Sequence, residues 1–440
     1  MNTKEITEDI RTAKSAQRSL EATSFETRNE MLLAISDALL ESIPYIMEAN
    51  VQDLEKARKE DLAKPLLKRL RFDEKKIVSV ANSLVEVAKL PDSIRKVIQR
   101  RTLDDHLLLE KVTVPIGVIG MIFESRPDAL VQIISLALKS GNAIILKGGR
   151  EAKETLSALI EVIRKALSAF PAGSKWIVHL TSRSDVQLIL GLDSDIDLLI
   201  PRGSNQFVRY IMNNSRIPVL GHADGLCSLY VDEQVDMDLA LNVAVDSKCQ
   251  YPAVCNAVET ILVHEKVAER FIPRFKDLTS RYPVIIHGDE RTCGIIEAEK
   301  ATQDDWDTEY LDYEVAMKVV DSMEEAMEHI ALHGSGHTDC IVTSNIEKAN
   351  TFLMKVDSAD VFHNCSTRFA DGFRFGLGAE VGISTQKIHA RGPVGLEGLV
   401  TGKWLMRGNG QTVAEFEDGK AYNHKELSVE GKAMTEATTW

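Results

Sequence analysis

The residue of this chain best suited to covalent chemistry is Cys255, in the run Gln250-Tyr-Pro-Ala-Val-Cys-Asn-Ala-Val. The polar part of this run leads straight into an apolar segment with the pattern of a strand, which predicts a thiol at a loop-to-strand junction. A thiol there can be exposed, and cations or backbone amides can stabilise its thiolate, as a nucleophile requires. The alternative is a small buried hydrophobe, the more common fate of an unpaired cysteine. The rest of the sequence has to decide between the two.

Two glycine-containing turns are suited to binding phosphate groups. Lys147-Gly148-Gly149-Arg150 follows one apolar run, Arg202-Gly203-Ser204-Asn205 follows another, and each precedes a helical pattern. Glycine permits close backbone approach, a helix amino end offers free N–H groups, and the basic side chains add charge. Either turn alone is also compatible with an ordinary loop. With two such turns in one sheet, a nucleotide site and a pair of ordinary loops both stay open.

Alternating strands and helices must position these turns. Residues 4–100 are mostly helical in pattern. Apolar runs after them predict strands at 114–123, 143–146, 176–180, 196–200 and 217–220. Helices are predicted to begin between these strands, near residues 128, 151, 184 and 205. This alternation predicts a parallel sheet covered on both faces, with ligands at the carboxyl ends of its strands. The usual Gly-x-Gly-x-x-Gly fingerprint is missing, which disfavours an ordinary Rossmann dehydrogenase.

A second α/β unit is predicted around the thiol. Its strands are expected at 228–232, 257–264, 284–287, 315–320 and 340–343, and its helices include 237–247, 324–332 and 346–356. A cleft between two such domains, with the thiol in one and a cofactor in the other, is a common geometry for chemistry.

Composition limits the partners. The 440 residues carry a formal net charge of -14, which argues against nucleic acid or an anionic membrane and favours a small-molecule partner. The six cysteines are scattered without zinc spacing, so we expect reduced thiols and no metal. The first residues lack the apolar core of a secretory signal, and the near-apolar run 112–123 is too short to span a bilayer. We therefore expect a cytoplasmic protein.

Several motifs resemble the aldehyde dehydrogenase superfamily: Pro115-Ile-Gly-Val-Ile-Gly120, the Lys147-Gly-Gly turn and Cys255-Asn256-Ala. Longer segments are similar to its gamma-glutamyl phosphate reductase family, and they span residues 123–128, 305–312, 334–339 and 375–396. The likeness runs from about residue 5 to about residue 410. The long carboxyl-terminal segment makes coincidence negligible.

The resemblance implies NADPH-dependent reduction of L-glutamyl 5-phosphate to L-glutamate 5-semialdehyde, the second step of proline biosynthesis. Cys255 would attack the acyl phosphate and form a thioester, which hydride then reduces. The backbone N–H of Cys255 is the candidate oxyanion donor, and Asn256 completes the motif. Arg126 takes the place of the oxyanion asparagine of hydrolytic aldehyde dehydrogenases and could bind a phosphate through two hydrogen bonds. The alternative for Arg126 is a surface residue at a helix start.

The resemblance also has implications for the choice of cofactor and for whether the enzyme activates water. Members that prefer NAD often carry a glutamate where this chain has Arg150, so a guanidinium here favours the 2′-phosphate of NADPH, unless Arg150 is simply solvated. Glu309 matches the glutamate that holds the nicotinamide ribose, although an exposed residue of an acidic loop is the alternative. The water-activating glutamate is missing, and the matching stretch is Gly221-His222-Ala-Asp224-Gly225. Its loss favours a reductase over a hydrolytic enzyme.

A basic, glycine-rich stretch between Ser366 and Gly392 predicts an anion site for the acyl phosphate or the glutamyl carboxylate. We expect the cluster to act as a whole, and its candidates are Arg368, Lys387, His389 and Arg391. The segment before the thiol departs from the narrower family, because Tyr251 and Ala253 replace an arginine and a glycine. Which cation stabilises the thiolate is therefore open.

The predicted organisation has three parts: an NADPH-binding domain at 1–225, a catalytic domain at 226–395, and an oligomerisation strand with a polar tail at 396–440. The strand would pair with a segment at about 100–112 and make a homo-oligomer, as superfamily members do. A separate glutamate 5-kinase is a possible partner, because an acyl phosphate is labile. Two alternatives to the implied reductase activity stay open: a hydrolytic aldehyde dehydrogenase, and a cofactor-binding scaffold in which Cys255 is inert.

Overall fold

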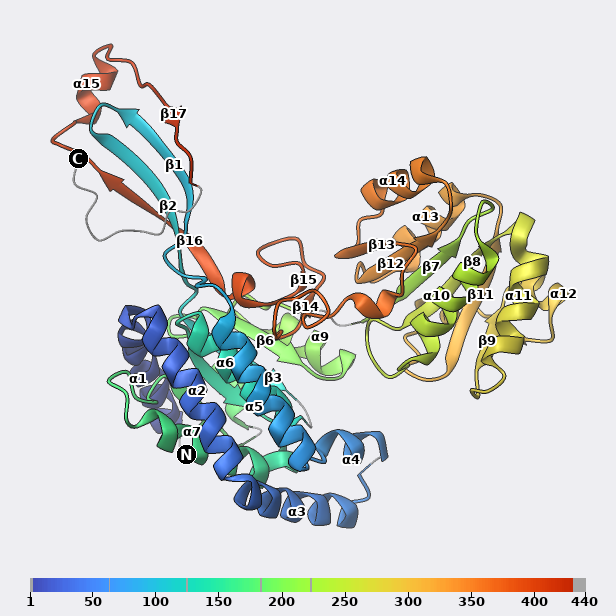
Figure 1. The fold of residues 1–440 in the computed structure, drawn as a ribbon, viewed down its shortest axis with the longest axis horizontal. Coiled ribbons are helices and arrows are strands. Elements are labelled where there is room, and N and C mark those ends of the chain that lie inside the picture. The colour runs from blue at the N-terminus through green and yellow to red at the C-terminus, as the bar shows by residue number, and fades with distance from the viewer. Residues whose placement is uncertain (1–2, 63, 124–125, 183, 222–223, 430–440) are drawn as a thin grey trace.

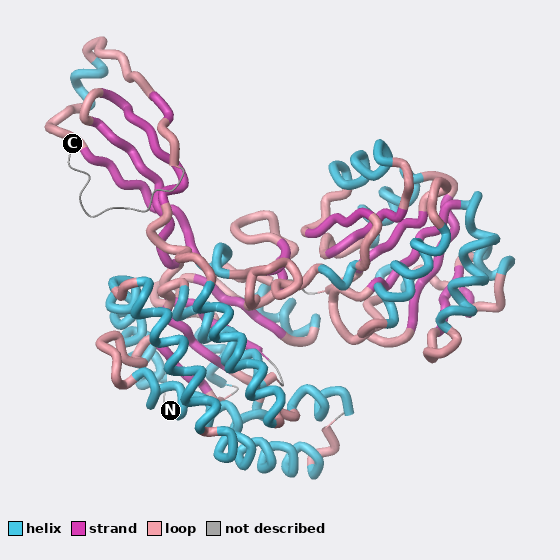
Figure 2. Tube along the Cα trace, in the orientation of Figure 1, coloured by secondary structure: helices cyan, strands magenta, loops and turns pink. Residues whose placement is uncertain are grey.

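The computed structural model describes residues 3–62, 64–123, 126–182, 184–221 and 224–429. It shows two α/β lobes and a β-stranded arm that projects away from them (Figure 1). Figure 2 shows the strands of the arm and of the two lobes as separate groups, with helices packed around the strands of each lobe. Within the described residues, no helix is long and apolar enough to cross a membrane.

The N-terminal lobe begins with helices whose apolar faces pack around its sheet. Met31, Leu32 and Ile35 recur at helical spacing and are fully buried. The Ser24 side chain accepts the N–H of Thr27 and caps the start of the second helix. These helices are α1 (Thr3–Ala22), α2 (Phe25–Glu41), α3 (Ile43–Lys59), α4 (Lys64–Leu70) and α5 (Glu74–Lys89).

The sheet of this lobe is parallel, and its strand order is β5-β4-β3-β6 in the described residues. Its strands are β3 (Val118–Phe123), β4 (Ala143–Lys147), β5 (Ile177–Leu180) and β6 (Leu198–Arg202). The connecting helices are α6 (Pro127–Lys139), η1 (Arg150–Ala152), α7 (Lys153–Leu167), α8 (Ser184–Ile189) and α9 (Asn205–Asn214). Because the strands are parallel, both predicted phosphate turns lie at the same edge of the sheet, after β4 and after β6.

Two predicted strands of this lobe are corrected by the structure. The run 114–123 is divided, because β2 (Leu107–Pro115) ends before Gly117 and β3 begins after it. Gly117 has φ 131°, and a side chain there would meet the Asp197 carboxylate at 2.3 Å. The run 217–220 forms only an isolated bridge between Leu199 and Val219, since Pro218 has no N–H to donate to a ladder.

The second lobe contains a parallel sheet whose strand order, within the described residues, is β10-β9-β11-β8-β7-β12-β13. Its strands are β7 (Cys227–Val231), β8 (Val258–His264), β9 (Ile285–Gly288), β10 (Glu299–Lys300), β11 (Glu314–Val320), β12 (Thr338–Val342) and β13 (Asp360–His363). Its helices are α10 (Met237–Cys249), α11 (Glu265–Thr279), α12 (Glu290–Ile295), η2 (Asp304–Asp307), α13 (Met323–His333) and α14 (Ile346–Lys355). The second α/β unit was therefore predicted correctly.

The chain then returns to the first lobe. Its remaining short elements are η3 (Thr367–Phe369), β14 (Ile383–Ser384), β15 (Gly392–Pro393) and η4 (Leu396–Leu399). Val381, Val394 and Leu399 are buried in the core of the N-terminal lobe. Residues 379–399 therefore pack on the first lobe, so the predicted catalytic domain, 226–395, ends beyond the sheet that carries the thiol.

The arm joins two distant parts of the sequence. Its strand order is β16-β2-β1-β17 in the described residues, and the pairs are antiparallel. The strands not yet introduced are β1 (Val97–Asp104), β16 (Val400–Arg407) and β17 (Lys425–Glu426), and a short helix α15 (Val413–Glu417) precedes β17. The predicted pairing of the segment at 100–112 with the strand after residue 396 is confirmed.

Candidate active site

Cys255 lies half-buried in the turn between α10 and β8, as the sequence predicted. Gly225 packs directly behind it. A Cβ atom on Gly225 would lie 2.2 Å from the Cys255 carbonyl oxygen and 2.6 Å from its Cβ. The buried Cys227 thiol donates a hydrogen bond to the same carbonyl oxygen at 3.1 Å. The backbone of the nucleophile is thus held by Gly225 and Cys227.

Asn256 anchors the other end of this turn. Its side chain is buried, and its Nδ2 donates to the carbonyl oxygen of Ala370 at 2.7 Å. Its Oδ1 has no hydrogen-bond partner among the described residues. The amide of Asn256 therefore holds the turn against the segment that follows η3.

Two further contacts reach the loop Gln250–Asn256 from outside the second lobe's sheet. Arg368, on η3, is buried and donates from Nε to the Gln250 side chain at 3.0 Å. Arg69, on α4, donates from Nη2 to the Ala253 carbonyl oxygen at 3.2 Å. Both arginines therefore lie beside a loop that has no cationic side chain of its own.

The thiolate has two arginines as electrostatic partners. Burial lowers the pKa of Arg202 and the pKa of Arg368, and in both cases the negative charge of Cys255 acts in the opposite direction. Arg126 repels Arg202 and so also lowers its pKa. Arg202, Arg126 and Cys255 thus form one electrostatic cluster. A cation close to a cysteine favours the reactive thiolate.

Glu380 belongs to the same cluster, and the sequence did not single it out. It lies 3.8 Å from Arg202 and accepts the N–H of Gly372 at 2.8 Å. Burial raises the pKa of Glu380, while Arg202 acts to lower it. From the sequence, Arg202 was predicted only as part of a phosphate turn. It ends β6, which pairs with β3 in parallel, and Arg126 follows β3, so their place at the same edge of the sheet was a signal that the two arginines could meet. The segment that contains Glu380 gave no such signal.

A buried ion pair lies under the nucleophile loop. Lys248 of α10 and Glu259 of β8 are 2.6 Å apart, with side chains 0% and 1% exposed. Burial raises the pKa of Glu259, and Lys248 opposes this effect. Glu259 also accepts the N–H of Leu311, a residue with φ 56°. This pair was not predicted from the sequence, where its one signal is a glutamate inside an apolar strand.

The first phosphate turn is built as predicted. Lys147 ends β4 and is buried, its Nζ donates to the Gly148 carbonyl oxygen, and burial lowers its pKa. A Cβ on Gly148 would lie 2.1 Å from the Leu156 side chain, so the turn packs closely on α7. Arg150 is 84% exposed and forms an ion pair with Glu60 at 3.3 Å. Its guanidinium is accessible to a ligand on the surface of the turn.

The start of α7 is fixed from α3. Asp53 is buried and accepts hydrogen bonds from Glu154 N, Thr155 N and Thr155 Oγ1 at 3.1, 2.8 and 2.6 Å. A buried carboxylate that caps a helix in this way holds the turn before the helix in one conformation. The turn Gly148–Gly149 is therefore preformed.

The second phosphate turn connects the lobes. Gly203 and Ser204 lead into α9, and Ser204 is its N-cap residue. The next residue, Asn205, donates from Nδ2 to Glu309 Oε2 at 2.7 Å. Glu309 lies just after η2 in the second lobe. The structure thus places the predicted ribose ligand next to a predicted phosphate turn.

Known proteins match this arrangement. The sequence model of the aldehyde dehydrogenase family matches residues 1–302. The gamma-glutamyl phosphate reductase of Ruminiclostridium cellulolyticum is 55% identical over 408 residues, which are 92% of this chain and 94% of that protein. This chain belongs to the aldehyde dehydrogenase family, among its gamma-glutamyl phosphate reductases. The predicted family and fold class are confirmed.

Solved structures of the aldehyde dehydrogenase family agree. The crystal structure of gamma-glutamyl phosphate reductase from Thermotoga maritima has a TM-score of 0.90 and 38% identity, and the match covers 93% of this chain and 99% of that one. An engineered glycolyl-CoA reductase with bound NADP+ has a TM-score of 0.65 and 14% identity, and the match covers 91% and 96%. The second likeness shows the shared fold.

The four basic residues predicted as one anion site do not gather in one place in this aldehyde dehydrogenase family member. Arg368 lies at the thiol, whereas Lys387 and Arg391 both form ion pairs with Asp357. His389 has φ 71° and lines a cavity of about 430 Å³ together with Lys96. Only Arg368 is therefore placed by the structure beside the nucleophile.

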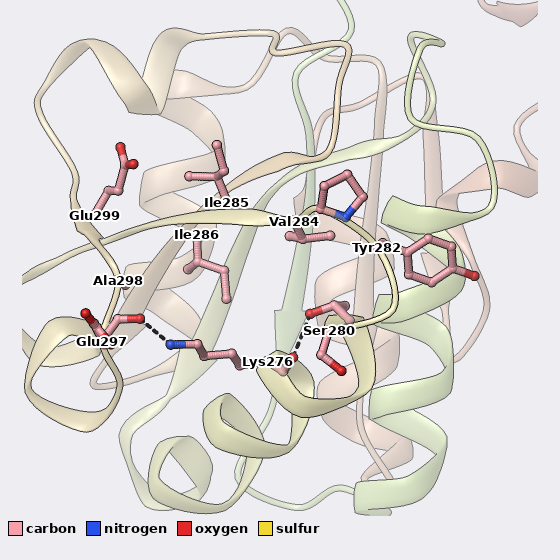
Figure 3. A pocket seen from close by; sticks show the side chains of 11 residues that line it. Lys276, Ser280, Tyr282, Val284, Ile285, Ile286, Glu297, Ala298 and Glu299 are labelled. Atoms are coloured by element: carbon pink, nitrogen blue, oxygen red, sulfur yellow. Dashed lines mark hydrogen bonds between the residues drawn. The ribbon is translucent and has the colours of Figure 1, made fainter.

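A pocket of about 630 Å³ lies at the outer edge of the second lobe. Figure 3 shows that its side chains come from α11, β9 and the segment before β10, and that Lys276 donates to the Glu297 carbonyl oxygen. None of the predicted site residues lines this pocket. This pocket is therefore separate from the predicted site residues. The stretch 221–225 takes the place of the water-activating glutamate, and two of its residues, His222 and Ala223, lie outside the described residues.

Proposed function

We propose that this chain reduces L-glutamyl 5-phosphate to L-glutamate 5-semialdehyde with NADPH and releases phosphate, in the second step of proline biosynthesis. The observation that carries the proposal is a half-buried thiol electrostatically coupled to Arg202, the last residue of β6, and to Arg368 on η3. The high identity to named gamma-glutamyl phosphate reductases supports the choice of substrate.

The chain's own residues supply most of this chemistry. The Cys255 thiolate attacks the acyl carbon, the C–O bond to phosphate breaks, and a thioester forms. We assign the leaving phosphate to Arg126 and Arg202, which lie in one electrostatic cluster with the thiol. We assign the oxyanion to the backbone N–H of Cys255. After reduction of the thioester, the sulfur leaves and the free thiol returns.

The residues at the two turns fit a nicotinamide dinucleotide. Backbone N–H groups at the start of α9, the ammonium of Lys147 and the carboxylate of Glu309 match its phosphates and ribose. Bound NADPH would supply the hydride that reduces the thioester. The exposed Arg150 would pair with a 2′-phosphate, so we propose NADPH rather than NADH.

The cofactor choice is tested by Arg150→Glu. This change should raise the Michaelis constant for NADPH much more than that for NADH, because a carboxylate repels the 2′-phosphate. Lys153→Glu is a matched control, since Lys153 is a nearby exposed cation that pairs with Glu154. Equal effects of Arg150→Glu on both cofactors would reject the assignment.

The activity is tested in the reverse direction, by following NADP reduction with glutamate 5-semialdehyde. The proposal expects this activity to require phosphate or arsenate, because the thioester must be released by an oxyanion. A hydrolytic aldehyde dehydrogenase would work without either anion. Cys255→Ser should abolish the activity, and full activity in this variant would favour a scaffold with an inert thiol.

We also propose a homo-oligomer formed through the arm. Trp404 and Met406 lie on the same face of the edge strand β16 and are 48% and 58% exposed. A molar mass by light scattering equal to one chain would reject this proposal.

The six free thiols are consistent with a protein that acts in the reducing cytoplasm. Handover of the acyl phosphate from a separate glutamate 5-kinase stays a prediction.

A further inference from the structure

The amino-acid end of the proposed substrate needs a cation of its own. The acyl phosphate and the α-carboxylate lie at opposite ends of the glutamyl group, so a single arginine at the reacting carbon cannot serve both. Arg126 and Arg202 lie with Cys255, where the phosphate leaves. The loop Gln250–Val258 contains no lysine or arginine. A cation for the α-carboxylate must therefore reach this loop from another segment.

Arg69 reaches the loop from the N-terminal lobe. It lies on α4, on the side of the N-terminal lobe toward the second lobe in Figure 1. Its Nη2 donates to the carbonyl oxygen of Ala253, two residues before the nucleophile. One of its five N–H donors is directed at this carbonyl. Arg69 is half-buried beside the nucleophile loop.

Arg69 and Arg368 differ from the other cations near the site, because each donates to a neutral acceptor, and Arg368 is coupled electrostatically to the Cys255 thiol itself. Arg202 pairs with Glu380, and Lys387 and Arg391 share Asp357. In the described part of the chain, no carboxylate forms an ion pair with Arg69. A half-buried guanidinium that has only a neutral protein acceptor retains a full positive charge for a bound anion.

The backbone next to Arg69 is held firmly. Leu70 and Phe72 are 0% and 1% exposed. The buried Asn50 donates to the Leu70 carbonyl oxygen at 3.0 Å and accepts the Phe72 N–H at 2.9 Å. The main chain after Arg69 therefore cannot turn away from the loop, and the guanidinium is preorganised.

We propose that Arg69 binds the α-carboxylate of the substrate while its contact with Ala253 keeps it beside the nucleophile. This inference rests on the proposed function. Ala253 and Cys255 are at most roughly 7 Å apart along an extended chain. The reacting carbon and the carboxylate carbon of a glutamyl group are separated by four C–C bonds, or about 5 Å. An arginine at Ala253 is therefore at a suitable distance from the end of a substrate bound at Cys255.

The test compares four aldehydes in phosphate-dependent NADP reduction. Glutamate 5-semialdehyde carries both α groups, 5-oxopentanoate lacks the amino group, 4-aminobutanal lacks the carboxylate, and butanal lacks both. Arg69→Gln should lower kcat/KM roughly 10- to 100-fold for the first two, as expected for one lost charge-assisted contact. It should change the other two less than about threefold, because they offer no carboxylate to the guanidinium.

Two further variants keep the test decisive. Arg69→Lys retains the charge and should recover part of the loss on the carboxylate-bearing substrates only. Arg71→Gln is a matched control two residues away, where the arginine is 69% exposed and pairs with Asp73, and it should leave all four substrates unchanged.

A uniform loss across all four aldehydes would overturn the inference, since a role in loop position alone makes no distinction between substrates. An unchanged kcat/KM for glutamate 5-semialdehyde in Arg69→Gln would overturn it as well. Both results leave the proposed function standing. Failure of the wild-type protein to use glutamate 5-semialdehyde with phosphate would instead reject the proposed function and this inference together.

Discussion

The close packing of Gly225 against the nucleophile leads to a specific prediction for Gly225→Ala. The new Cβ would lie 2.2 Å from the Cys255 carbonyl oxygen, 2.5 Å from its Cα and 2.6 Å from its Cβ. Two of these atoms belong to the backbone, so no side-chain rotation relieves the overlap. The nucleophile itself must move, or the backbone that carries Gly225 must retreat.

The size of the effect follows from ordinary contact distances. Carbon atoms in contact are separated by about 3.5–4.0 Å, so the overlap requires a displacement of roughly 1 Å or more. A misplacement of about 1 Å in a reacting group can lower the rate by about 10²-fold. We therefore expect kcat to fall about 100-fold in Gly225→Ala, because the thiol no longer meets the acyl carbon in the productive geometry.

The assay is the initial rate of NADP reduction with glutamate 5-semialdehyde and phosphate, together with thermal unfolding of each variant. Gly294→Ala is the matched control, because it makes the same change on α12 with no atom within 4 Å of the new Cβ. It should leave kcat unchanged. A Gly225→Ala enzyme with wild-type kcat would refute the fixed position of Cys255, since its turn would then tolerate a side chain behind it.

Three further predictions concern buried charge. Lys248→Met should lower the free energy of unfolding, measured by urea denaturation, by about 3–5 kcal/mol, because Glu259 is left buried without its cation. The double variant Lys248→Met/Glu259→Leu should recover most of this loss, because it leaves no buried charge unpaired. Burial lowers the pKa of Lys139 to about 8 from its ordinary value of 10.5. Between these two pH values the unfolded chain binds more protons than the folded chain, so the free energy of unfolding should rise with pH. The free energy of unfolding of Lys139→Met should lack this rise. Arg202→Met should slow alkylation of Cys255 by iodoacetamide at neutral pH by removing a cation near the thiolate, whereas Lys387→Met should not.

The sequence was most informative where a function depends on residues adjacent in the chain. Cys255 and the turn at Lys147 were located correctly because a loop-to-strand or strand-to-helix junction has a local pattern. The main errors of element assignment arose at Gly117 and Pro218, where one residue interrupts an apolar run. A backbone angle and a missing N–H decide these boundaries, and hydrophobic periodicity detects neither.

The contacts that fix the nucleophile could not be predicted in the same way. Lys248 and Glu259 are 11 residues apart, and their pairing depends on how α10 packs against β8. Arg69 and Ala253 are 184 residues apart and come from different lobes. Composition and periodicity describe each segment separately, so they identify charged residues without showing which of them meet. The basic stretch illustrates this limit, because Arg368 lies at the thiol whereas Lys387 and Arg391 share Asp357.

The position of these arginines also explains how an acidic protein can bind an anionic substrate. The net charge of -14 repels anions at long range, but charges on the surface are screened over about 8 Å at physiological ionic strength. Arg69, Arg202 and Arg368 all lie at the nucleophile loop or within electrostatic reach of its thiol. Partly buried charges are screened less, so these arginines control the local potential at Cys255. In the proposed reaction this local positive potential would attract the acyl phosphate to Cys255 despite the negative charge of the whole chain.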